Sequence, residues 1–278
     1  MKKLPGIPRW VATITLIALV TTVTACATSP TGRSQFKLFS SQEISQMGNQ
    51  SYQQMREQLP VVEGGELYAY VNCVAEPMLR EVGGDWQVTL FDEDEVNAFA
   101  LPGNNIGIYR GLLRVAENQH QLAAVVGHEI AHVQAEHGNE RVSTAFATQA
   151  GLELGSAIAG GTPTGNYVMA ALGLGAQVGI MLPFSRAQET EADVIGLRLM
   201  ADAGFDPTES IKLWENMDKA AGGGRPPDFL STHPGPSARI RTLTQHMDDA
   251  VSRQQQAHSQ GKRPDCFLSD SARAQLQN

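Results

Sequence analysis

The sequence lacks the features of a nucleic-acid-binding protein and of a cysteine metal site. It has only three cysteines in 278 residues, and Cys73 and Cys266 lack the close spacing of cysteine zinc ligands. No basic stripe stands out, and a net charge of −8 argues against a nucleic-acid partner. No internal repeat is present. The length allows one large core or two small ones.

Long uncharged runs are also scarce, and the first of them lies at the N-terminus. Lys2, Lys3 and Arg9 precede an uncharged stretch over residues 10–23, which is short for a membrane span but suits the core of a signal peptide. Small residues lead to Cys26, and the whole segment resembles a bacterial lipoprotein signal, in which the cysteine is lipidated. An ordinary secretory signal with an incidental cysteine is the alternative.

We therefore predict a signal peptide over residues 1–25, a lipid such as palmitate on Cys26, and a tether over residues 26–39 that is rich in Ser, Thr, Pro and Gly. The mature chain would have a net charge of about −11, because the removed segment carries three positive charges and no acid. We expect it to face the periplasm from the cell envelope. Ala27 after the cysteine favours the outer membrane. In an oxidising compartment, Cys73 and Cys266 are expected to form a disulfide.

Residues 40–252 are predicted to form a mainly helical α+β domain, followed by a polar tail over residues 253–278 that is ordered only if Cys266 pins it. The pair Ser40 and Glu43 has the spacing of a capping box, which opens a helix to about Gln58. Other helices are predicted around residues 67–79, 118–138, 186–203, 207–214 and 240–243, and strands around residues 86–90, 96–100 and 106–109.

The central motif is His128-Glu129-Ile130-Ala131-His132. On a helix, residues four apart lie about 40° apart around the axis and roughly 6 Å along it, so both imidazoles can reach one ion. The glutamate between them lies beside that ion, where it can act as a general base. This is the H-E-x-x-H pattern of hydrolytic zinc sites, although a buried helix with two histidines bonded to each other would share it.

A catalytic zinc needs a third protein ligand and an open position. Glu189 and Asp193 share one face of a later helix, which suits a ligand and a carboxylate that orients a histidine ring through its free nitrogen. Glu191 points elsewhere on that helix, and we expect it to be solvated or paired with Arg186. His137 lies half a turn from the ligand face if the metal helix continues, so we predict for it only a hydrogen bond at the helix end.

Four motifs in this order resemble metallopeptidase family forty-eight, the HtpX-like and CaaX-prenyl-type zinc endopeptidases. The similarity is greatest to the lipoprotein-anchored bacterial members. The motifs are Asn97–Ala100, Gly127–Val133, Ser185–Asp193 and Thr232–Ile240. The resemblance implies a zincin-like fold, zinc on His128, His132 and Glu189, Glu129 as base, and peptide bonds as substrate. It also implies a small sheet whose edge strand, formed by Asn97, Ala98, Phe99 and Ala100, pairs with an extended substrate.

The expected function is hydrolysis of misfolded or unassembled envelope proteins, with the outer-membrane assembly machinery as a further partner. The alternative is a chaperone-like or assembly lipoprotein that keeps zinc without significant proteolysis. His233 has three interpretations: a donor that stabilises the oxyanion, a ligand that blocks the open zinc position, or a structural residue at a helix start. Arg239 and Tyr109 are the alternative candidates for the donor. The small, apolar stretch over residues 144–182 is expected to form two close-packed helices, with membrane contact as the lesser alternative.

Overall fold

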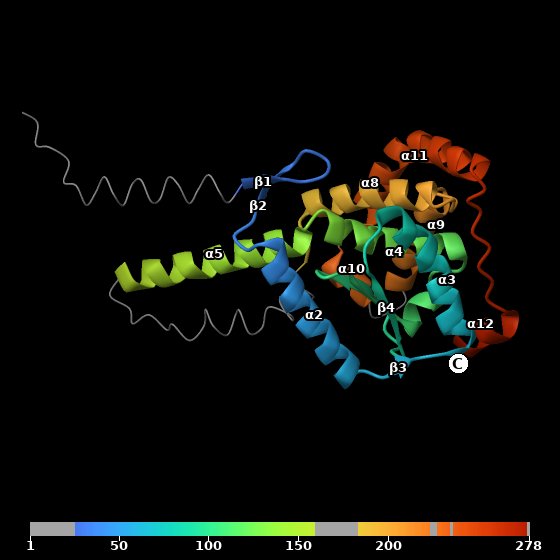
Figure 1. The fold of residues 1–278 in the computed structure, drawn as a ribbon, viewed down its shortest axis with the longest axis horizontal. Helices are drawn as coiled ribbons and strands as arrows, with labels where there is room; N and C mark the ends of the chain where they lie inside the picture. Colours follow the sequence, from blue (N-terminus) through green and yellow to red (C-terminus); the bar gives the residue numbers. More distant parts are fainter. Residues whose placement is uncertain (1–25, 159–182, 223–226, 234–235, 277–278) are drawn as a thin grey trace, which may run out of the picture.

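Figure 1 shows the computed structural model, which describes residues 26–158, 183–222, 227–233 and 236–276. The predicted signal peptide over residues 1–25 and the uncharged run over residues 167–182 lie outside the described residues. Within the described ranges, no helix combines the length and the apolar character that crossing a bilayer would require.

The body of the molecule is helical, as the sequence predicts. The capping box of Ser40 and Glu43 is formed and opens α2. Ser185 and Gln188 make a second capping box at the start of α8. The helices are α2 (Ser41–Gln58), α3 (Gly65–Val82), α4 (Gln119–Gln134), α5 (His137–Ile158), α8 (Arg186–Asp202), α9 (Glu209–Ala221), α10 (Asp228–Thr232), α11 (Pro236–Ser259) and α12 (Asp270–Leu276), with a 3₁₀ helix η1 (Arg110–Arg114).

A small mixed sheet packs against helices α3 and α4 on one face and against helix α2 on the other. Its strands are β3 (Val61–Val62), β4 (Gln87–Phe91), β5 (Ala98–Leu101) and β6 (Asn105–Tyr109), in the order β3-β4-β6-β5. Strands β4 and β6 are parallel, and the other two pairs are antiparallel. The strands predicted around residues 96–100 and 106–109 form an antiparallel hairpin, and the mainly helical α+β fold is confirmed.

Strand β5 forms an edge of this sheet, and within the described residues no strand pairs with its outer side. The amide of Tyr109 donates to the carbonyl of Asn97 (3.0 Å). In an antiparallel pair, the backbone N–H and C=O groups of successive residues point alternately toward the partner strand and away from it. The backbone groups of Phe99 therefore also point toward β6, whereas those of Ala98 and Ala100 point away from it. The free edge therefore begins at Ala98.

Helices α4 and α8 lie side by side (Figure 1), and their close approach depends on two glycines. A Cβ atom on Gly127 would lie 2.9 Å from the carbonyl oxygen of Gly196, and one on Gly196 would lie 2.8 Å from the backbone of Gly127. Side chains at either position would push the helices apart. The contact lies next to His128, so it brings α8 close to the H-E-x-x-H motif.

The tail is held to the body by a disulfide between Cys73 on α3 and Cys266, as predicted. Helix α11 continues past Ser252 to Ser259, and the segment after it carries Leu268 and Leu276 into the main hydrophobic core. The last described residues therefore belong to the folded domain.

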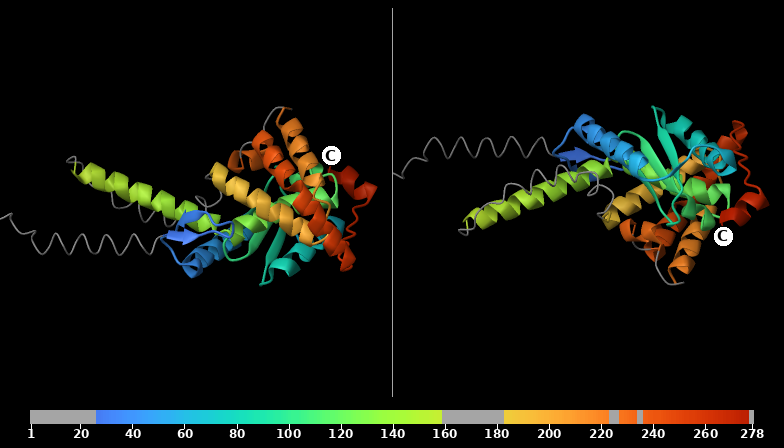
Figure 2. Two further views of the ribbon diagram at one scale, coloured as in Figure 1. Left: turned by 90° about the horizontal axis from the view of Figure 1, so that it is seen from above. Right: turned by 90° about the horizontal axis from the view of Figure 1, so that it is seen from below.

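The other end of the described chain is also folded. Residues 26–36, where the sequence predicts a tether, form a hairpin of β1 (Cys26–Thr28) and β2 (Ser34–Phe36). This hairpin packs beside α5, which extends away from the rest of the molecule (Figures 1 and 2). Helix α5 includes residues 144–158 of the small, apolar stretch.

Candidate metal centre

Helix α4 carries the H-E-x-x-H motif and ends earlier than the sequence predicts. Asn118 caps its start by accepting the amides of His120 and Gln121 (both 3.0 Å). The helix stops at Gln134, and Glu136 takes a left-handed conformation (φ 50°) before α5 begins at His137. The prediction of one helix to residue 138 was wrong, because no glycine or proline marks this break.

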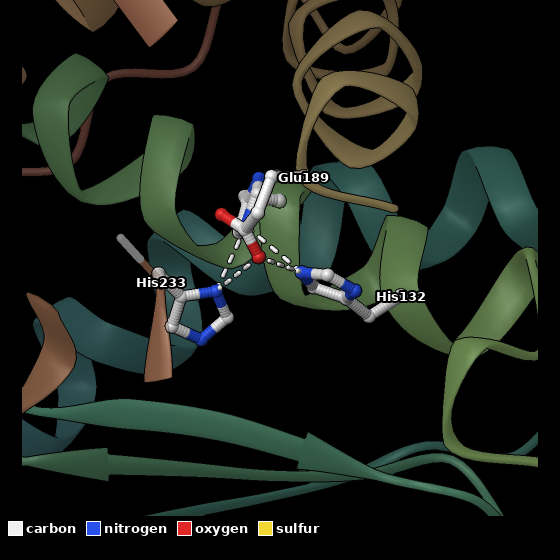
Figure 3. Close-up of side chains that lie close together, drawn as sticks. His132, Glu189 and His233 are labelled. Atoms are coloured by element: carbon white, nitrogen blue, oxygen red, sulfur yellow. Dashed lines mark hydrogen bonds and ion pairs between the residues drawn. The ribbon is translucent and has the colours of Figure 1, made fainter. Parts of the chain in front are cut away.

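Four buried side chains from three segments lie close together: His128 and His132 of α4, Glu189 of α8, and His233 after α10. Figure 3 shows three of them, His132, Glu189 and His233. One ligand atom from each lies within 4.8 Å of all the others. The Nε2 atoms of His128 and His132 are 2.9 Å apart. Glu189 lies 3.6 Å from His128 Nε2 and 3.4 Å from His132 Nε2. The three predicted metal ligands are thus brought together.

These distances suit zinc. Donor atoms at about 2.0–2.1 Å from a tetrahedral zinc ion are roughly 3.3 Å from one another. Burial, together with the charge of Arg239, holds the pKa of His128 well below its usual value, and burial does the same to the pKa of His132. Both imidazoles are therefore neutral, which is the form that binds metal. The donor set and its spacing fit the ion that the H-E-x-x-H motif implies.

Arg239 of α11 lies behind Glu189 and holds its carboxylate in place. Its Nη1 is 2.5 Å from Glu189 Oε2, its Nε is 3.0 Å from both oxygens of Asp193, and its guanidinium lies over the ring of Trp214 at 3.8 Å. Burial alone would raise the pKa of Glu189, but the charge of Arg239 and its other partners hold that pKa well below the usual range. Glu189 is thus an ionised donor.

Asp193 lies one turn after Glu189 and faces His128. Its Oδ1 is 3.3 Å from His128 Nδ1, the ring nitrogen that points away from the other ligands. This is the arrangement that the spacing of Glu189 and Asp193 suggests, with the addition that Asp193 is also paired with Arg239. The sequence predicts Arg239 as an alternative donor toward substrate, whereas in the structure it contacts Glu189, Asp193 and the ring of His128 (Nη2 to Nδ1 2.6 Å).

Glu129 connects the metal ligands to the edge of the sheet. Its Oε2 accepts the amide of Ala100 (3.0 Å), one of the groups that point away from β6. Its Oε1 makes no hydrogen bond, although His233 Nε2 lies 3.4 Å away. Burial, reinforced by the charge of Glu189, raises the pKa of Glu129 well above its usual value. A buried carboxylate with a free oxygen and a raised pKa is suited to accept a proton.

His233 contacts two of the metal ligands directly, and Phe229 connects it to the start of β5. Its Nδ1 is 3.0 Å from Glu189 Oε1 and 3.2 Å from His128 Nε2. Its ring stacks on Phe229 (4.3 Å), whose amide donates to the carbonyl of Val96 just before β5 (3.1 Å). Tyr109, the other residue considered as a donor, instead packs against Phe91 and Phe99.

A second chain of contacts leads from His132 away from the metal ligands. His132 Nδ1 is 2.8 Å from His137 Nδ1, and His137 Nε2 is 3.1 Å from Glu191 Oε2. With His132 Nε2 facing the metal, its Nδ1–H must donate to His137, whose Nε2–H then donates to Glu191. The expectations of a solvated Glu191 and of a helix-end His137 were wrong, because the break after α4 turns His137 back onto His132.

The N-terminal hairpin adds two contacts to Glu191, at the end of this series of hydrogen bonds. Thr31 Oγ1 donates to Glu191 Oε1 (2.5 Å), and Arg33 Nε donates to Glu191 Oε2 (2.9 Å). Arg33 also forms a bidentate pair with Glu140 of α5 (2.7 Å to each oxygen). The segment that follows Cys26 is therefore bonded to a metal ligand through two intermediate side chains, Glu191 and His137.

The His137→Ala variant is expected to bind zinc about 10–100-fold more weakly, because His132 loses the acceptor that orients its ring. Competition with a chromophoric chelator measures the affinity. The control is His120→Ala, since His120 is a half-buried histidine of α4 that bonds to Asp206 away from the metal ligands. His137→Gln, which offers both an acceptor and a donor, should restore part of the affinity. Equal affinity in His137→Ala and the wild type would contradict this role.

Comparison with known proteins agrees with this geometry. Residues 64–247 match the family model for peptidase family M48. The chain is 36% identical to the mitochondrial metalloendopeptidase OMA1 of Schizosaccharomyces pombe over 173 residues (59% of this chain, 48% of that protein). It is 31% identical to the beta-barrel assembly-enhancing protease of Escherichia coli over 204 residues (70% and 42%), and 28% identical to mitochondrial OMA1 of Bos taurus over 238 residues (80% and 46%). The chain spans less than half the length of each of these relatives.

Proposed function

Because this chain belongs to peptidase family M48, we propose that it is a zinc-dependent endopeptidase that cuts unfolded or unassembled proteins of the cell envelope. One observation carries the proposal: the buried Glu129 bonds the free edge of β5 on one oxygen and leaves the other oxygen unbonded beside His128, His132 and Glu189. A base, a metal site and a surface for an extended backbone are thus adjacent.

The substrate would bind as an added strand. The outward N–H and C=O groups of Ala98 and the C=O of Ala100 are the partners that β5 offers. Pairing of this kind requires an extended segment whose own backbone groups are free. Folded proteins rarely present such a segment, because their backbone groups are already bonded. The edge strand therefore supports a preference for unfolded chains.

In the reaction, Glu129 would take a proton from the attacking water through Oε1, and would later give that proton to the leaving amine. Its raised pKa brings its basicity closer to neutral pH, which favours both transfers. Zinc, when bound to His128, His132 and Glu189, supplies Lewis-acid polarisation of the scissile carbonyl and makes the water more acidic. Arg239 and Asp193 keep Glu189 and His128 in position throughout.

His233 lies where a fourth ligand would close the site. Its Nδ1 is as near to Glu189 and His128 as those residues are to each other. Four protein ligands are typical of structural zinc sites, and catalytic sites keep one position open. We propose that His233 occupies the open zinc position in the resting enzyme, which lowers its activity, and that His233 moves away from this position during turnover.

The His233→Ala variant should therefore raise basal hydrolysis of casein several-fold at equal zinc content. A roughly hundredfold loss of turnover would instead assign His233 the role of oxyanion donor. Hydrolysis within about twofold of the wild type would leave it a structural role only. Zinc content is measured in parallel, so that a loss of metal is not mistaken for a catalytic effect.

The class of substrate can be tested directly. The E. coli relative is named a beta-barrel assembly-enhancing protease, which suggests outer-membrane barrel proteins as substrates here. Zinc-loaded protein is incubated with one such barrel protein, either freshly diluted from urea or already folded in detergent. We expect cleavage of the unfolded form alone. Equal cleavage of both forms, or of neither, would contradict the proposal.

A chaperone-like role without proteolysis is less well supported. A zinc site that serves only structure has no need of a carboxylate base. Here Glu129 is buried beside the ligands with an oxygen that makes no hydrogen bond, an arrangement that costs stability and is useful in catalysis.

We further propose that a lipid on Cys26 anchors the protein to the envelope membrane. In support, the segment just after Cys26 is folded against the domain, so an anchored molecule would hold its metal site near the membrane. The Cys26→Ser variant should move from the membrane fraction to the soluble fraction of the cell envelope, as followed by immunoblotting after fractionation. Membrane association that persists would direct attention to residues 167–182 instead.

A further inference from the structure

A cleft of about 200 Å³ opens beside β5 on the His132 side of the metal centre. Helix α2 forms one wall and the start of α5 another, and the turn from β5 to β6 lies between them. The parts of its lining that matter here are Ile44, Met47, His132, Val133, Val142 and Phe184. His132 is a metal ligand, so whatever fills this cleft lies next to the bond that is cut.

The lining favours an apolar occupant. Ile44, Met47, Val133, Val142 and Phe184 supply aliphatic and aromatic surface. One carboxylate, that of Glu136, also lines the cleft, but it is already paired with Lys37 and accepts a hydrogen bond from Ser41 (2.7 Å). For size, an apolar cavity of about 150 Å³ in another protein accepts benzene. This cleft is therefore large enough for a leucine, methionine or phenylalanine side chain.

The cleft is held in shape by close backbone contacts. A Cβ atom on Gly48 of α2 would lie 2.0 Å from the carbonyl oxygen of Pro102, so the helix rests directly on the turn after β5. Asn105 adds a hydrogen bond to Asn49 of α2 (2.6 Å). A pocket whose walls are packed this closely does not need to form when a ligand arrives.

The position of the cleft along β5 determines which substrate residue enters it. Ala100 bonds to Glu129, and the cleft lies from Ala100 onward, along Leu101 and Pro102. A substrate strand that pairs antiparallel with β5, the more stable arrangement, runs in the opposite direction. The substrate residues beside Leu101 and Pro102 then precede the bond that is cut.

We propose that this cleft is a substrate subsite that selects a large apolar side chain on the N-terminal side of the scissile bond. The inference rests on the proposed peptidase function and adds a sequence preference to it. About a third of the lining comes from residues 41–51 of α2, which precede the part of the chain that matches the family model. The preference is thus built in part by residues outside that match.

The test uses zinc-loaded protein in two steps. First, casein fragments are sequenced by mass spectrometry to locate the cuts. The fragments then show which position before the cut bond is enriched in large apolar residues. Peptides that span one strong cut are synthesised with leucine, alanine or aspartate at that position. We expect the leucine peptide to exceed the alanine peptide by roughly tenfold or more in kcat/KM, which is the usual effect of filling an apolar pocket.

The Val142→Trp variant should fill the cleft. It should lower kcat/KM for the leucine peptide by at least about threefold more than kcat/KM for the alanine peptide, because only the leucine side chain needs the volume that is filled. Thr144→Trp is the matched control, because Thr144 is exposed on the same helix and does not line the cleft. It should keep the preference for leucine.

A second measurement does not depend on turnover. Labelled leucine and alanine peptides are titrated into zinc-loaded Glu129→Gln protein, with and without Val142→Trp, and binding is followed by fluorescence anisotropy. The subsite is supported if the leucine peptide binds more tightly than the alanine peptide and Val142→Trp removes this difference. Cleavage without any preference before the bond, a preference only after it, or equal effects of Val142→Trp on both peptides would overturn the subsite and leave the peptidase function intact. No cleavage of any substrate by wild type, with equal binding of both peptides, would overturn both.

Discussion

The Glu129→Gln variant should lose roughly a thousandfold in peptide hydrolysis and still hold about one zinc ion per chain. Glutamine has the shape of glutamate, and its amide oxygen can still accept the Ala100 amide that Glu129 accepts now. It cannot take a proton from water at neutral pH. The variant therefore separates proton transfer from metal binding, because Glu129 is adjacent to the ligands without belonging to the group of four.

Casein hydrolysis and zinc content by mass spectrometry, on the same preparation, measure the two properties. Glu117→Gln, which removes an exposed carboxylate just before α4, controls for the change of charge. Full activity in Glu129→Gln would show that another group is the base, and the proposed mechanism would fall. A simultaneous loss of zinc would mean that the residue supports the site structurally.

The second large effect concerns the ligand from α8. Glu189→Ala should weaken zinc binding by a hundredfold or more. If three ligands share about 10–16 kcal/mol of binding free energy, the loss of one removes about 3 kcal/mol at least. The substitution also leaves Arg239 with Asp193 as its remaining carboxylate partner, which keeps the buried arginine paired.

The matched control is Glu209→Gln, another buried glutamate, which bonds Asn118 and Gln121 away from the metal ligands. Its zinc affinity should equal that of the wild type. Chelator competition measures both variants, and circular dichroism checks that each is folded. Unchanged affinity in Glu189→Ala would show that the third ligand is another residue, and His233 would be the first to examine because of its contacts.

The site could be predicted where its residues share one helix. His128, Glu129 and His132 have a fixed relation through the helical repeat, and so do Glu189 and Asp193. The capping boxes at Ser40 and Ser185 are local for the same reason, since each lies within one turn. The disulfide was expected from the number of cysteines and the compartment, and the structure confirms it.

The partners of Glu191 could not be predicted, because they depend on contacts between distant parts of the chain. Thr31 and Arg33 lie about 160 residues before it. The role of His137 was missed for a different reason: the helix breaks at Ala135 and Glu136, where a left-handed glutamate replaces the glycine that usually signals such a break. Arg239 was predicted as part of a motif and as an alternative oxyanion donor, but its packing on Trp214 and its pairing with Asp193 required the tertiary structure.

If the enzyme prefers unfolded chains, as we propose, each unfolded copy of the enzyme is a substrate for its neighbours, and the disulfide then has a protective consequence. The bridge closes a loop of 193 residues that contains all four members of the metal site. In the chain-entropy account, a loop of this length stabilises the folded state by about 5 kcal/mol. That lowers the unfolded population by nearly four orders of magnitude, at about 1.4 kcal/mol for each factor of ten. On that proposal the link between Cys73 and Cys266 would limit self-digestion, and its reduction should shorten the life of the enzyme most at high enzyme concentration.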